Sequence, residues 1–148
     1  MNAIQLLKKD HATVKELFAQ FEHAGDRAYH TKQTIVKQIH QALEVHAQLE
    51  EELFYPAVKQ LQAEKVKDLV REAIEEHKIV KTLLAEIAAM SAQEEQYDAE
   101  VTVLKETVEH HVKEEEGEMF PAATKQLPKE RLEELGAEMA AHQEAMAA

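Results

Sequence analysis

Two segments of the chain are near copies of each other, and this repeat constrains the fold more than any other feature of the sequence. The first copy contains His46, Glu50 four residues later and Pro56 ten residues after the histidine. The second copy contains His111 and Glu115 with the same spacing, and again a proline ten residues after the histidine. The repeat therefore predicts a molecule built from two related halves.

A further histidine precedes each copy at nearly the same distance. His11 lies 35 residues before His46, and His77 lies 34 residues before His111. Each half thus combines one upstream histidine with one His-x-x-x-Glu pair, and imidazole and carboxylate are common metal ligands in proteins. The pattern predicts two metal ions held between the two halves.

The composition and the spacing of the apolar residues predict helices. The chain has 148 residues with only three Gly and three Pro, and apolar residues recur at helical three- and four-residue intervals. The expected helices cover about residues 3–23, 31–62, 65–90, 95–126 and 128–146. Pro56 is expected to kink its helix or to end it early. Short connections favour antiparallel neighbours, so the predicted fold is an all-α, antiparallel up-down four-helix bundle with a short additional C-terminal helix, forming one domain over residues 1–148.

Six polar side chains fall on the apolar stripes of the four long helices, where core residues are expected. They are His11, His46, Glu50, His77, His111 and Glu115. An unpaired polar group in a core costs about 2–7 kcal/mol, whereas a domain of this size has only about 5–15 kcal/mol of net stability. As shared ligands of divalent or trivalent cations the six groups satisfy one another, because His and Glu four residues apart lie on one helix face. The alternative is a helical bundle that binds a partner without metal, which would leave the six groups unpaired.

Ligand chemistry and net charge narrow the class of protein. The absence of cysteine excludes disulfides and thiolate-held zinc or iron–sulfur centres, and imidazole with carboxylate suits iron, zinc, copper or manganese. A formal net charge of −12 repels phosphate backbones, so no nucleic-acid partner is expected. The chain has neither an apolar run that could cross a bilayer nor a recognisable signal peptide, so we expect no membrane partner and a cytoplasmic location.

The repeated His-x-x-x-Glu-Glu motif, followed in both copies by Phe and Pro, resembles the hemerythrin-like, or HHE cation-binding, family over about residues 11–121. The resemblance implies an antiparallel four-helix bundle around a non-haem di-iron centre with an oxo or hydroxo bridge. It also implies that His11 and His46 bind one iron, that His77 and His111 bind the other, and that Glu50 and Glu115 bridge the two.

The sequence departs from the oxygen-carrying hemerythrins at two positions. Those proteins have a fifth histidine one turn before the equivalent of His77, where this chain has Ala73, and an aspartate in place of Glu115, five residues after its histidine. One iron would then have an open position. We expect a di-iron protein that binds oxygen or a related small ligand, peroxide or nitric oxide, in sensing, storage or detoxification. An enzyme that decomposes peroxide or oxidises iron, and a protein that stores or buffers iron, stay open as alternatives.

Two further residues have alternative interpretations. Tyr55 lies just before Pro56 and could hydrogen-bond to the centre, but a packing role at the end of the bundle is the favoured prediction. His142, in the C-terminal helix, could supply the missing ligand, but a packing or surface role is favoured.

Overall fold

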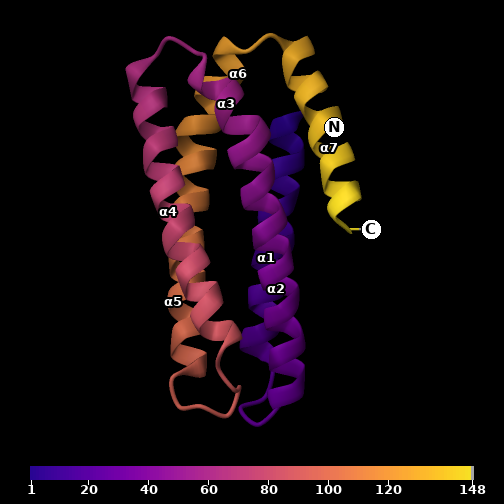
Figure 1. The fold of residues 1–148 in the computed structure, drawn as a ribbon, viewed down its shortest axis with the longest axis vertical. Coiled ribbons are helices and arrows are strands. Elements are labelled where there is room, and N and C mark those ends of the chain that lie inside the picture. Colours follow the sequence, from indigo (N-terminus) through magenta and orange to yellow (C-terminus); the bar gives the residue numbers. More distant parts are fainter. Residues whose placement is uncertain (148) are drawn as a thin grey trace.

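Each predicted apolar stripe folds into a helix, and four long helical rods pack side by side in alternating directions (Figure 1). This computed structural model describes residues 1–147. The helices are α1 (Ala3–His23), α2 (Tyr29–Leu49), α3 (Tyr55–Lys59), α4 (Glu64–Ala88), α5 (Tyr97–Glu114), α6 (Phe120–Gln126) and α7 (Lys129–Ala147). The predicted all-α bundle with an additional C-terminal helix is confirmed. None of the helices within residues 1–147 has the length and apolar character that crossing a bilayer requires.

A π-helical turn precedes the proline in the second and the fourth rod. Glu50–Phe54 joins α2 to α3, and Glu115–Met119 joins α5 to α6. The first of these turns closes when the Tyr55 amide donates to the carbonyl of Glu50, five residues earlier. Proline has no N–H, and its ring crowds the carbonyl four residues before it in an α-helix. The wider turn relieves both problems, so the rod continues past Pro56 as α3 instead of ending there.

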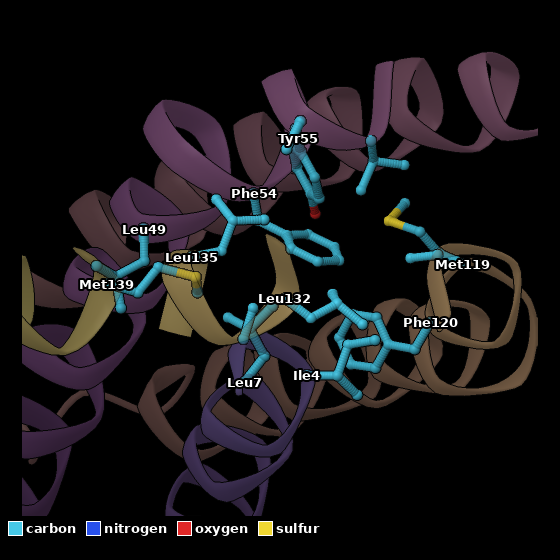
Figure 2. Packing of buried hydrophobic residues seen from close by; sticks show 14 of the residues in the cluster. Ile4, Leu7, Leu49, Phe54, Tyr55, Met119, Phe120, Leu132, Leu135 and Met139 are labelled. Atoms are coloured by element: carbon cyan, nitrogen blue, oxygen red, sulfur yellow. The ribbon is translucent and has the colours of Figure 1, made fainter. Parts of the chain in front are cut away.

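Two apolar clusters fill the bundle and leave a polar layer between them. The first cluster lies at the α3 and α6 end and includes Leu7, Leu49 and Phe120 (Figure 2). The second cluster fills the other end of the bundle and includes Phe18 and Leu104. Each rod therefore passes from one apolar cluster to the other, and the predicted polar residues occupy the stretch between them, away from bulk water.

The C-terminal helix α7 packs on the outside of the bundle against α1 and α2 (Figure 1). Its Gly136 permits this approach, because a methyl group there would come within 2.3 Å of the Met1 carbonyl oxygen. Later in α7, His142 lies at the surface with its Nε2 3.2 Å from Glu52 Oε2. This position agrees with the predicted surface role of His142 and keeps it out of the polar layer.

Candidate metal centre

The structure brings all six predicted residues together between the two apolar clusters. The helices α1, α2, α4 and α5 each contribute one histidine, and each π-helical turn begins with one of the glutamates. All six side chains are buried, and Glu50 is completely inaccessible to solvent. The spacing that placed these residues on apolar stripes therefore identified the residues that meet in space.

The six side chains form two groups that share both carboxylates. His11 and His46 belong to the first group together with Glu50 and Glu115, and the remaining two histidines form the second group with the same two glutamates. Within each group, one ligand atom per residue lies within 4.8 Å of the others. The arrangement offers two adjacent cation positions with the carboxylates between them.

Two buried polar atoms of the centre have no hydrogen-bond partner within residues 1–147, namely His46 Nε2 and Glu50 Oε2. His46 Nε2 lies 3.3 Å from Glu50 Oε1, but this contact lacks the geometry of a hydrogen bond. A buried polar atom left without a partner costs about 1–3 kcal/mol. A cation bound between the imidazole and the carboxylate satisfies both atoms, so the residues fit a metal ion.

Four outer carboxylates, which the sequence interpretation missed, hold the second ring nitrogen of each histidine. The contacts to Nδ1 run from Asp10 to His46 (3.0 Å), from Glu51 to His77 (2.7 Å), from Glu76 to His111 (2.7 Å) and from Glu116 to His11 (2.6 Å). An Nδ1–H that donates to a carboxylate leaves the Nε2 lone pair free to bind a metal, and such outer partners orient the ring. The Nε2 atom of each histidine lies near a shared glutamate or near another Nε2 atom of the centre.

These outer acids follow a signal that is present in the sequence. In both halves one acid directly precedes the first histidine (Asp10, Glu76), and another directly follows the shared glutamate (Glu51, Glu116). The preceding acid bonds to the second histidine of its own half, whereas the following acid crosses to the first histidine of the other half. Two members of the glutamate runs, Glu51 and Glu116, therefore contact histidines of the centre.

Tyr55 points into the centre, so the favoured prediction of a packing role alone is wrong. Its hydroxyl donates to Glu115 Oε2 at 2.5 Å and lies 3.1 Å from Glu50 Oε1, and its ring stacks on His77. Figure 2 shows the hydroxyl oxygen directed into the bundle. Five residues after Glu50, a side chain on an α-helix would point about 140° away from it. The π-helical turn reduces this offset, and the sequence alone did not show that turn.

Carboxylates dominate the electrostatics of the centre. Burial disfavours protonation of His46, but the nearby Glu50, Asp10 and Glu115 outweigh it and raise its pKa to about 10. The pKa of His111 rises to about 12, because Glu115, Glu50 and Glu76 likewise outweigh its burial. Without metal, the centre thus retains protons on His46 and His111 to balance the carboxylates. Cations supply the same balance and release those protons.

Comparison with known proteins places the chain in a family. The hemerythrin HHE cation binding domain matches residues 2–123. The chain belongs to the hemerythrin HHE cation-binding family. A solved hemerythrin HHE cation binding domain-containing protein from Mycobacterium kansasii is 28% identical with a TM-score of 0.85, over 99% of this chain and 87% of that one. A DNA nickase from Nostoc sp. is 30% identical over 141 residues, which are 95% of this chain but only 39% of the nickase, so the chain spans about two fifths of that relative.

This hemerythrin-like chain also has a cavity beside the candidate centre with room for a small ligand. A largely enclosed cavity of about 40 Å³ adjoins all four histidines, and its remaining walls are mostly apolar. The apolar lining residues are Val14, Leu43, Ala47, Val80, Leu84, Val108 and Val112. One water molecule needs about 10–15 Å³ by the same measure, so the cavity accommodates a molecule of a few atoms. Ala73, where oxygen carriers have a fifth histidine, is buried in the first apolar cluster.

Proposed function

We propose that this chain is a non-haem di-iron protein that binds oxygen or a related small ligand, peroxide or nitric oxide, in sensing, storage or detoxification. The sharing of Glu50 and Glu115 between two pairs of histidines carries this proposal. Two irons would each take two imidazoles, with both carboxylates and an oxo or hydroxo group between them. The set of nitrogen and oxygen donors without thiolate suits iron, and the unpartnered atoms of His46 and Glu50 support cation binding there.

The surrounding residues have distinct tasks in this proposal. When bound, the iron pair supplies the electrons that reversible binding of a small oxidant requires. The outer carboxylates keep the histidine rings oriented and hold the proton on Nδ1. The two apolar clusters exclude water from the centre, and the cavity beside the four histidines limits the size of the ligand.

Peroxide decomposition is the second candidate function, and the position of Tyr55 favours it. The Tyr55 hydroxyl is buried and donates to Glu115 Oε2, and it also lies 3.4 Å from His77 Nε2. Burial, together with the charges of Glu50 and Glu115, raises the pKa of this phenol well above its ordinary value. Tyr55 therefore stays protonated and keeps a hydrogen-bond donor inside the centre, from which it can hydrogen-bond to a peroxide molecule.

Three further expectations remain predictions. Residues 1–148 are expected to form one domain in the cytoplasm. The net charge of −12 still argues against a nucleic-acid partner, and the name of the Nostoc relative describes that longer protein. Binding of labelled single- and double-stranded DNA at low salt tests the nucleic-acid prediction directly.

Metal analysis and one optical experiment test the proposed function. After expression with added iron, we expect about two irons per chain. The reduced protein, kept without oxygen, is then exposed first to oxygen and then to peroxide. A spectral change that reverses when oxygen is removed supports carriage or sensing, and rapid consumption of peroxide supports the second candidate. A protein that contains no iron, or only zinc, would contradict the di-iron proposal.

A further inference from the structure

A third cluster of metal-ligand side chains lies at the surface, just outside the buried centre. It consists of Glu76 on α4 and of His110 and Glu114 on α5, with one ligand atom per residue within 4.8 Å of the others. His110 Nε2 is 3.5 Å from Glu76 Oε2 and also contacts Glu114, one turn further along the helix. The His110 side chain is 66% exposed, so an ion in solution can reach this cluster directly.

The two carboxylate oxygens of Glu76 face different histidines. Its Oε1 lies 2.7 Å from Nδ1 of His111, which is one of the six residues of the buried centre. Its Oε2 faces His110 at the surface. A single carboxylate therefore separates the surface cluster from the buried centre, and a cation at the surface would share that carboxylate with a proposed ligand of the centre.

The equivalent place in the first half of the repeat is closed. Asp10 takes the position of Glu76, but Val45 and Leu49 stand where the second half has His110 and Glu114. The outer oxygen of Asp10 instead accepts a hydrogen bond from Gln143 of α7 at 3.1 Å. Because α7 packs against α1 and α2, the first half has no such open cluster among the residues that the structure describes.

We propose that Glu76, His110 and Glu114 form a surface site for a divalent cation, through which metal ions reach the buried centre. One imidazole and two carboxylates form a ligand set that suits Fe²⁺, Mn²⁺ or Zn²⁺, and the acidic chain concentrates cations near its surface. The surface site stands on its own geometry, whereas the transfer of ions from it rests on the function proposed above. The alternative is a simple ion pair between a protonated His110 and its two glutamates.

A zinc titration distinguishes a metal site from an ion pair. We expect the protein as isolated to bind one more Zn²⁺ per chain than the His110→Ala variant, measured by calorimetry and by metal analysis after dialysis. His40→Ala is the matched control, because His40 and Glu44 are also four residues apart on one helix and 2.8 Å apart, but within residues 1–147 they belong to no three-residue ligand group. Equal zinc binding by His110→Ala and the unmodified protein would overturn the surface site.

An iron-loading experiment tests the transfer of ions. Metal-free protein is mixed with Fe²⁺ without oxygen, and iron uptake is followed in time. We expect His110→Ala to load several-fold more slowly than the unmodified protein and to reach the same final iron content, with His40→Ala unaffected. Equal loading rates would overturn the transfer step. If neither protein takes up iron in its buried centre but the zinc difference persists, the proposed function fails while the surface site stands.

Discussion

The two halves of the bundle share their ligands and differ in what surrounds them. Each half has two histidines, one shared glutamate and two outer acids at equivalent sequence positions. The aromatic residue before the proline differs, because Tyr55 brings a hydroxyl to the carboxylates, whereas Phe120 only stacks on His11. The outer acids also differ in their second contact, since Asp10 accepts a hydrogen bond from Gln143 of α7 and Glu76 lies 3.5 Å from the exposed His110. The repeated features match the needs of metal binding, whereas the buried hydroxyl belongs to the first half and the three-residue surface cluster to the second.

The hydrogen bonding of the equivalent histidines His46 and His111 is also unequal. His111 Nε2 lies 3.2 Å from Glu115 Oε2 and 3.2 Å from His77 Nε2. His46 Nε2 has no hydrogen-bond partner within residues 1–147. In the metal-free centre, the first half therefore makes fewer hydrogen bonds than the second. We expect His46 to lose its proton first when the pH is raised.

Removal of a shared carboxylate should have the largest effect, because it damages both halves at once. We expect Glu115→Ala to lose both metal ions and to lower the free energy of unfolding by at least about 3–5 kcal/mol, since buried histidines lose their partner. His46→Ala should also lose metal and stability, but mainly at the cation position of its own group. Metal content per chain and urea unfolding measure both effects.

The matched control for this comparison is Glu118→Ala, in the same π-helical turn. Glu118 is exposed and lies 3.6 Å from Lys65, so its removal should change neither metal content nor stability appreciably. Full iron content in Glu115→Ala would show that this carboxylate is not a ligand. Equal loss of both ions in His46→Ala would show that the two cation positions empty together.

The pH dependence of the stability of the metal-free protein should also differ between the two halves. The pKa is about 10 for His46 and about 12 for His111, against about 6.5 in an unfolded chain. The folded state thus holds protons that the unfolded chain releases above pH 6.5. This stabilisation is complete below pH 6.5 and is lost as the pH rises towards 10, first at His46.

Between pH 7 and 8 the stabilisation that each of these two histidines gives the metal-free protein should fall by about 1.4 kcal/mol, because the folded state keeps a proton that the unfolded chain has lost. Urea unfolding of metal-free and iron-loaded protein across this range measures the slope, and histidine NMR signals identify which ring loses its proton first. The iron-loaded protein should show the flatter profile, because metal has replaced the protons. A metal-free protein whose stability rises with pH would contradict the proton balance described here.

Local spacing was sufficient to predict the helices and the meeting of the six polar residues. The observed limits of the four continuous rods and of α7 lie within three residues of the predicted helices, because apolar residues at helical intervals define both the helix and its buried face. Spacing did not predict the contact from Glu51 to His77, which joins two different rods. It also predicted only a packing role for Tyr55, because the π-helical turn, which brings the Tyr55 hydroxyl to Glu50, could not be read from the spacing.

Replacement of Tyr55 by phenylalanine makes the two halves alike before the proline and should have the smallest effect on stability. Tyr55→Phe removes the hydrogen bond to Glu115 and should cost about 1 kcal/mol, or about 2–4 °C in Tm, without loss of iron. If the Tyr55 hydroxyl hydrogen-bonds to peroxide, the same variant slows peroxide consumption while oxygen binding persists. Phe120→Tyr added to Tyr55→Phe offers a hydroxyl beside His11 and should not restore the rate, because Phe120 stacks on a histidine of the other pair. An unchanged peroxide rate in Tyr55→Phe would limit Tyr55 to holding the carboxylates in place.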